Sequence, residues 1–211
     1  MENQIGTFLN SQDNVEKIRD RIVSILTTEL SAQKKLAEKE LCAKDFDIKV
    51  YIENCRPWLL VSDNPRLNPF PLINVSLSET KEDGNPGSTI DKVKYTATFY
   101  MDCYGCGNYN TENNLDDSLS AIRAWKTARI VRNILMSGFY VHLGMQGLVR
   151  RRRIPKITTI VPTNNASMAI TICRIALEVE FYEDSLQGQG ITLEGISFES
   201  KDNGEASLIN I

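Results

Sequence analysis

Apolar residues recur with helical spacing in two segments of the chain. In the first segment they stand three or four positions apart and share one stripe of a helix: Val15, Ile18, Ile22, Ile25, Leu26 and Leu30. Asp13 precedes this stripe as a candidate N-cap, and Glu16 stands three residues later, the spacing of a capping box. We therefore expect a helix after Asp13, and the polar stretch 31–40 either continues it or forms a solvated extension.

The second helical segment begins near Asp116 and Asp117, whose charges favour the first turn of a helix. Its expected buried stripe consists of Ala121, Trp125, Ala128, Val131 and Leu135. Three basic residues fall on another side: Arg123, Lys126 and Arg129. Gly138 is the expected stop.

Strict alternation of apolar and polar residues predicts strands in 46–53, 72–79, 91–103 and 173–181. The expected inward residues are Phe46, Ile48, Val50 and Ile52; Ile73, Val75 and Leu77; Val93, Tyr95, Ala97, Phe99, Met101 and Cys103; and Cys173, Ile175, Leu177, Val179 and Phe181. The segment 80–89 is rich in Gly, Pro, Asn and Asp, so it predicts a turn between two antiparallel strands.

The order of these elements predicts an α+β fold, an antiparallel or mixed sheet with two main helices packed on one face. The chain has 211 residues and is 42% hydrophobic, which is enough for one good core. We expect a single domain over 1–185 and a C-terminal extension over 186–211 that holds one short strand.

Charge is distributed unevenly along the chain. No Asp or Glu occurs between Ser118 and Leu177, whereas ten Lys or Arg residues do. The other 14 basic residues stand against all 27 acidic ones, so this segment carries +10 and the remainder −13. Such asymmetry indicates either a polyanionic partner or a self-complementary surface.

Four consecutive arginines, Arg150 to Arg153, stand within a strand-like run of this basic segment. Successive strand side chains point to opposite faces, so neither face of the run fits an apolar core. One interpretation is edge protection, in which charges prevent unwanted strand pairing. The other is contact with a partner, and we expect these arginines to be largely solvent-accessible without acidic partners in their own subunit.

Recognisable catalytic chemistry is absent from the sequence. Cys103 and Cys106 have the spacing of half a zinc site or a redox pair, but no second such pair exists and His142 is the only histidine. The five cysteines, an odd number, argue for free thiols. Trp125 is either a core residue, as its spacing indicates, or a platform for nucleic-acid bases. We expect no catalytic residue, no metal and no cofactor.

Membrane insertion and secretion are not indicated either. The chain has no run of about twenty apolar residues, and residues 1–14 lack the basic and apolar regions of a signal peptide. We expect a soluble protein that is intracellular during its synthesis and has no membrane partner.

Two stretches carry a family resemblance: LSAIRAWKTARIVRNILMS, and GLVRRRRIPKITTIVP followed by the long alternating strand. With the element order from about residue 13 to residue 185, they resemble the tail terminator or tail-completion (head–tail joining) proteins of long-tailed phages and prophages. The resemblance implies an α+β fold and a non-enzymatic assembly protein. Such proteins form rings, commonly hexamers, that cap the tail tube and join a head-completion or neck protein around the channel for DNA.

From this resemblance we expect a virion protein of the tail or neck, assembled in the host cytoplasm. The basic residues are the expected contacts with other subunits, with the tail tube protein or with DNA in the channel: Arg150, Arg151, Arg152, Arg153, Lys156, Arg123, Lys126 and Arg129. One alternative is a small nucleic-acid-binding module that uses the same residues, although the net charge of −3 argues against it. A second alternative is an enzyme whose site has no local motif.

Overall fold

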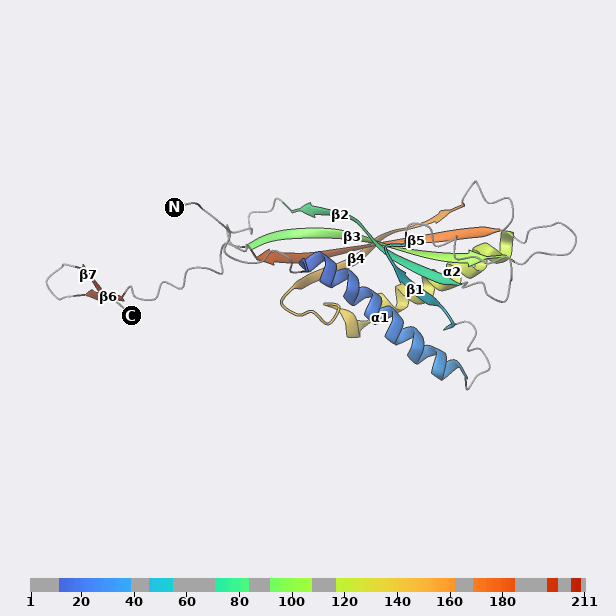
Figure 1. Cartoon of the computed structure of the whole chain (residues 1–211), viewed down its shortest axis with the longest axis horizontal. Coiled ribbons are helices and arrows are strands. Elements are labelled where there is room, and N and C mark those ends of the chain that lie inside the picture. The colour runs from blue at the N-terminus through green and yellow to red at the C-terminus, as the bar shows by residue number, and fades with distance from the viewer. Residues whose placement is uncertain are drawn as a thin grey trace, which may run out of the picture.

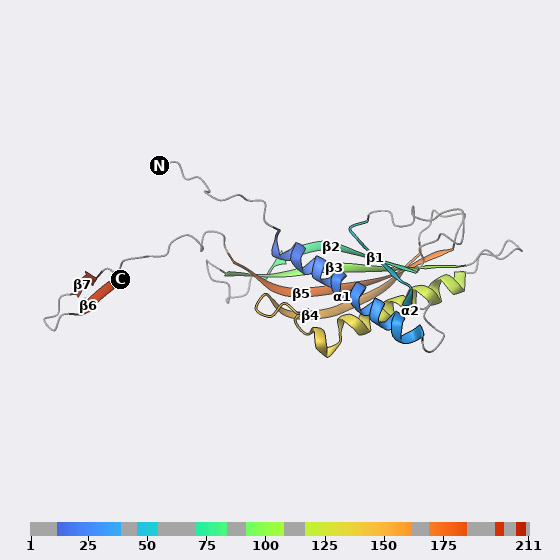
Figure 2. The same cartoon turned by 60° about the horizontal axis from the view of Figure 1, so that its bottom comes forward.

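Two helices cover one face of a five-stranded sheet, as Figures 1 and 2 show. The computed structural model describes residues 12–38, 46–54, 71–83, 92–107, 117–161, 169–184, 197–200 and 206–209. The sheet contains β1 (Lys49–Ile52), β2 (Leu72–Glu82), β3 (Lys92–Cys106), β4 (Val149–Ile160) and β5 (Ile170–Asp184), in the order β1-β2-β3-β5-β4. β1 is parallel to β2 and every other pair is antiparallel, so the α+β fold with a mixed sheet is confirmed.

The first helix, α1 (Asn14–Ala37), begins where its sequence predicts. The backbone N–H of Asp13 donates to Oε2 of Glu16 at 3.1 Å, which is one half of the capping box. The expected stripe is buried against the sheet from Ile18 to Leu30. The polar stretch after Leu30 continues the helix to Ala37.

The second helix, α2 (Asp117–Leu135), is rotated relative to the expected stripe. Ala128, Val131 and Leu135 are buried as expected, but Ala121 is only half-buried and Trp125 is 46% exposed. Three smaller residues, Ser120, Ala124 and Thr127, complete the buried side together with Ile134. The expectation that Trp125 belongs to the core is therefore wrong.

Gly105 of β3 gives the physical reason for this rotation. A Cβ atom added at Gly105 would lie 2.1 Å from the carbonyl oxygen of Ser120 and 2.5 Å from the backbone nitrogen of Ala124. The helix backbone thus approaches the strand directly, and only small side chains fit between them. An indole at the contact would force the helix away from the sheet, so Trp125 lies to the side.

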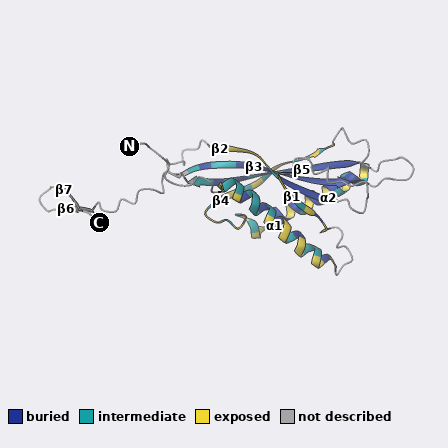
Figure 3. Cartoon of the chain, viewed as in Figure 1, coloured by how far each residue is buried: buried dark blue, intermediate teal, exposed yellow. Residues whose placement is uncertain are grey.

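The core lies between the helices and the sheet, where Figure 3 shows long buried stretches on the central strands β3 and β5 and exposed stretches on the helices. The helix-facing strand residues are those of the predicted alternation: Ile73, Val75, Ala97, Phe99, Met101, Cys103, Cys173, Ile175, Leu177, Val179 and Phe181. At the strand ends the alternation predicts less well, because Ile52 is 43% exposed and Leu77 is 36% exposed.

Strand ends also extend beyond the predicted boundaries. β2 continues to Glu82, inside the predicted turn, and β3 continues to Cys106. The rest of that turn lies outside the described residues. In the expected extension the structure describes two short strands, β6 (Ser197–Ser200) and β7 (Ala206–Ile209), which pair as an antiparallel hairpin where one strand was predicted.

Candidate functional site

Arg152 is the C-terminal cap of α2. Its Nε donates to the carbonyl oxygen of Leu135 at 2.5 Å, its Nη2 to that of Ser137 at 2.7 Å and its Nη1 to that of Val141 at 2.9 Å. The first of these carbonyls belongs to the last residue of the helix and the other two follow it, at the end where a cation complements the helix dipole. Partial burial lowers the pKa of Arg152. The side chain therefore has a structural role within its own subunit.

Arg151 and Arg153 project from the sheet face opposite the helices and pair with glutamates of β5. Nε of Arg153 lies 2.5 Å from Oε2 of Glu178, and Nη1 of Arg151 lies 3.8 Å from Oε1 of Glu180. The expectation that the run lacks acidic partners in its own subunit is therefore wrong for these two residues. Antiparallel pairing places β4 beside the two glutamates, which lie just beyond the acid-free stretch of sequence.

Arg150 and Lys156 are exposed on β4, which is an edge strand of the sheet. Lys156 follows an irregularity in the pairing with β5 that spans Pro155, a residue that an edge strand tolerates. The position of β4 fits the edge-protection interpretation of the arginine run. Arg150, Arg151 and Arg153 are exposed as expected, whereas Arg152 is not.

The basic residues of α2 are also divided between two environments. Arg123 is half-buried and its Nη1 donates to the carbonyl oxygen of Cys106 at 2.7 Å, at the end of β3. Lys126 and Arg129 line a pocket on the outer side of the helix. The eight residues predicted as contacts are therefore spread over both sheet faces and two helix sides, and they form no single patch.

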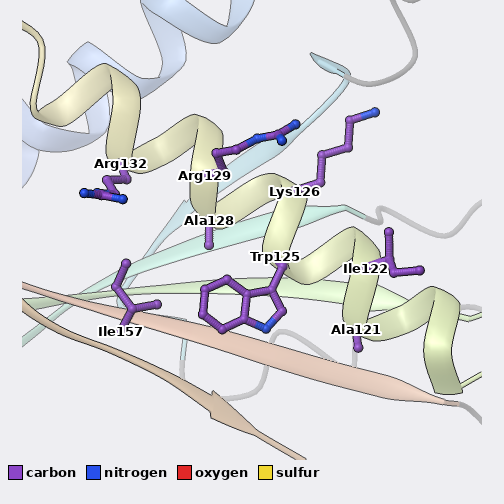
Figure 4. A pocket seen from close by; sticks show the side chains of 8 residues that line it. All are labelled: Ala121, Ile122, Trp125, Lys126, Ala128, Arg129, Arg132 and Ile157. Atoms are coloured by element: carbon purple, nitrogen blue, oxygen red, sulfur yellow. The ribbon is translucent and has the colours of Figure 1, made fainter.

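The pocket has a volume of about 680 Å³ and lies between α2 and β4 (Figure 4). Its lining consists of Ala121, Ile122, Trp125, Lys126, Ala128, Arg129, Arg132 and Ile157. Figure 4 shows the Trp125 indole directed from α2 towards the strands, with Arg132 and Ile157 at one end of the pocket and Ile122 at the other. An apolar floor beside three cations, with no carboxylate among the described lining residues, suits an anionic partner that also offers apolar groups.

Exposed apolar side chains continue from this pocket along the chain. Of the nine exposed large hydrophobic residues among the described ones, five lie within 20 consecutive residues: Ile122, Trp125, Met136, Phe139 and Val141. Phe139 belongs to a short 3-10 helix, η5 (Gly138–Tyr140), and is 93% exposed. The Tyr140 hydroxyl donates to Glu29 of α1 and ties this turn to the body of the protein.

We call the combined feature the α2 outer surface, defined by Ile122, Trp125, Lys126, Arg129, Arg132, Met136 and Phe139. Concentrated exposed apolar residues mark interaction surfaces. The exposure of Trp125, Arg132 and Phe139 was missed by sequence reasoning. A signal was present: Ser120, Ala124 and Ala128 are small residues four positions apart and indicate the side of closest helix contact.

The two cysteines with metal-site spacing lie on opposite faces of β3. Cys103 pairs in register with Cys173 on the helix side, whereas Cys106 pairs with Ile170. Side chains that point apart in this way cannot form a disulfide without backbone movement. Burial raises the pKa of all three thiols, to about 11 for Cys173. The described part of the chain holds no group of three or more His, Cys, Asp or Glu placed to bind a metal.

Comparison with protein-family models gave no match, and comparison with curated proteins gave none either. Among the described residues, neither helix is long and apolar enough to span a membrane.

Proposed function

We propose that this protein is a structural assembly protein of a phage or prophage tail. In this proposal it caps the tail tube and contributes to the head–tail junction as a ring oligomer. The sequence resemblance implies this role, and the α+β fold with two helices on one sheet face agrees with what that resemblance implies. Its partners are further copies of itself, a tail tube protein and a neck protein.

The observation that carries the proposal is the α2 outer surface. It combines a nearly fully exposed Phe139 and a half-exposed Trp125 with two arginines, Arg129 and Arg132. Neither arginine forms an ion pair with another residue in the described part of the chain. Aromatic and arginine side chains dominate the binding energy of protein interfaces. A surface of this composition is typical of a protein that works through contacts with other proteins.

Oligomeric state and tube capping test this proposal directly. Native mass spectrometry and negative-stain imaging of the purified protein, alone and with polymerising tail tube protein, should show closed rings and tubes that stop growing when it is added. The control omits the protein from the same tubes. A monomer at high concentration that leaves tube length unchanged contradicts the proposal.

Nucleic-acid binding is the second candidate, and one observation favours it. Trp125 is exposed beside Lys126, Arg129 and Arg132, and an aromatic ring among cations is an arrangement used to stack bases of single strands. A mobility-shift titration at several salt concentrations tests it. Binding through these cations should weaken steeply with salt, and Trp125→Ala should reduce the affinity at every salt concentration.

A further inference from the structure

We infer that the α2 outer surface of one copy docks into an acidic groove on the opposite sheet face of a second copy. This inference rests on the proposed ring and names the two surfaces that would form it. The contact joins two different patches, so it is heterologous, the kind of contact that generates rings when the rotation closes.

The acidic groove has a volume of about 360 Å³ and lies over the ends of β2, β3 and β5. Its lining consists of Glu79, Lys81, Glu82, Asp83, Thr96, Thr98, Arg153, Glu178 and Glu180. Among the described lining residues, five carboxylates stand against two cations. Lys94 and Arg151, which are not among these residues, also pair with Asp83 and Glu180, so the excess of negative charge is smaller than this count. The described lining of the α2 pocket holds three cations, Lys126, Arg129 and Arg132.

Part of the acidity of the groove is already neutralised within the subunit. Glu178 pairs with Arg153, Glu180 lies 3.4 Å from Nζ of Lys94, and Asp83 lies 2.5 Å from the same Nζ. The hydrogen bond from Lys94 lowers the pKa of Asp83. Glu79 and Glu82, in contrast, are exposed and take part in no ion pair with the described residues. These two carboxylates are therefore the acidic groups available to a partner.

One copy cannot bring these two surfaces together. The start of α2 packs on β3 at Gly105, on the helix side of the sheet. The lining of the groove includes Thr96 and Thr98 of β3. Thr98 pairs in register with Glu178, and Glu178 forms an ion pair with Arg153 on the sheet face opposite the helices. The two patches thus lie on opposite faces of the sheet, so a contact between them must join two copies.

Each surface supplies what the other lacks. Arg129 and Arg132 offer cations to Glu79 and Glu82, while Trp125 and Phe139 offer apolar area that remains exposed in the single subunit. Complementary charge fixes the orientation and the specificity of such a contact more than its strength, and the aromatic residues supply binding energy. Like surfaces repel each other, so two copies cannot pair symmetrically through either patch.

Charge reversal on each surface tests the pairing. The first variant carries Arg129→Glu and Arg132→Glu, and the second carries Glu79→Arg and Glu82→Arg. Each should lose the rings by itself because its α2 surface and groove have charges of the same sign. An equal mixture should regain rings in which the two variants alternate, since every contact then joins opposite charges. A chain with all four substitutions should also regain rings.

A matched control carries Lys17→Glu and Lys35→Glu on α1, which changes the net charge as much as the first variant does at exposed positions elsewhere. It should form rings like the unsubstituted protein. Circular dichroism and thermal unfolding of all variants show that each is folded, and native mass spectrometry with one variant mass-labelled shows whether the variants alternate.

The outcomes distinguish failure of the proposed ring from failure of this pairing of surfaces. If the unsubstituted protein forms no ring, alone or on tubes, the proposed function fails. If it forms rings and both charge-reversed variants do too, or if the mixture does not restore them, this pairing of surfaces is wrong while the ring stands. If the first variant keeps its rings but loses nucleic-acid binding, the α2 outer surface binds nucleic acid and the inference is overturned.

Discussion

Arg152 of β4 donates from Nε to the carbonyl oxygen of Leu135, the last residue of α2, at 2.5 Å. Together with the bonds to Ser137 and Val141, this contact connects the edge strand to the end of the helix. The arginine in the middle of the most basic run thus stabilises the fold. Arg151 and Arg153, on either side of it, point to the sheet face opposite the helices, and Arg150 is exposed to solvent.

Replacing Arg152 with Ala should destabilise the protein by about 2 kcal/mol, because the variant loses three bonds from a charged donor and leaves helix-end carbonyls without a partner. Urea unfolding measures the change. Arg150→Ala is the matched control, an exposed arginine two residues away, and should change stability by less than about 0.5 kcal/mol. Equal losses in both variants would contradict the capping role.

The capping role of Arg152 also decides what replacing all four arginines with serine should do. If all four arginines were exposed, their replacement would leave the fold intact and impair assembly alone. Because Arg152 is a cap, the fourfold variant should instead unfold at lower urea concentration. A variant that keeps Arg152 and replaces Arg150, Arg151 and Arg153 isolates the effect on assembly.

Periodicity predicted the fold well because the core is made by local alternation. The stripe of α1 and the helix-facing residues of β3 and β5 are buried as expected, since one face of each element meets one contiguous core. The alternation pattern does not show which residues far apart in the sequence become neighbours in the fold. Glu178 and Glu180 become neighbours of Arg153 and Arg151 only through the pairing of β5 with β4.

The candidate site was predicted less well for the same reason. The rotation of α2 that exposes Trp125 depends on the approach of the helix to Gly105, a residue 20 positions earlier on another element. Lys126 and Arg129 were predicted as contacts and do line the pocket, whereas Arg132 and Phe139 were not predicted. Exposure of an apolar residue is set by tertiary packing, so the apolar stripe alone does not indicate it; the small residues Ser120, Ala124 and Ala128 were the available signal.

Gly105→Ala should destabilise the protein by about 1–3 kcal/mol, because the new Cβ would meet backbone atoms of Ser120 and Ala124 and α2 must move away from β3. Thermal unfolding followed by circular dichroism measures the loss. The control is Gly138→Ala, where an added Cβ meets nothing within 4 Å and the backbone has no positive φ. It should leave the melting temperature almost unchanged. A neutral Gly105→Ala would refute the close helix–strand contact.

The ion pair between Asp102 and Arg174 should respond asymmetrically to substitution. Nε and Nη2 of Arg174 donate to the two carboxylate oxygens of Asp102 at 2.6 and 2.8 Å, and the guanidinium lies over the Tyr100 ring. The Asp102 side chain is only 6% exposed, whereas that of Arg174 is 36% exposed. Arg174→Met leaves a buried carboxylate unpaired and should cost about 3 kcal/mol. Asp102→Asn leaves a partly hydrated cation and should cost less.

A double-mutant cycle in urea checks this asymmetry. The variant with both Asp102→Asn and Arg174→Met has no buried charge left, so it should be more stable than Arg174→Met alone. Arg153→Met serves as the control, because it breaks an ion pair whose cation is 56% exposed and should cost at most about 1 kcal/mol. If Asp102→Asn is the more damaging single change, the carboxylate is not the group that burial penalises.

Buried thiols should make the protein less stable in alkali. Burial raises the pKa of Cys173 to about 11 from an ordinary value near 9, so the unfolded chain releases this proton at lower pH than the folded one. The stability contribution is complete below pH 9 and is lost as the pH rises towards 11. Urea unfolding between pH 8 and pH 11 should show a decline that is smaller in Cys173→Ala. The same burial should protect Cys103, Cys106 and Cys173 from alkylation in the native state.

Lys94 also contributes to the pH dependence in alkali, because its hydrogen bond to Asp83 raises its pKa. Both the unsubstituted protein and Cys173→Ala keep this lysine, so its contribution cancels in the difference between their pH profiles. Peptide mapping after N-ethylmaleimide treatment, with and without urea, reports the three described thiols separately. Identical pH profiles, or full labelling of Cys173 in the native protein, would show that this thiol is not held in the protonated form by burial.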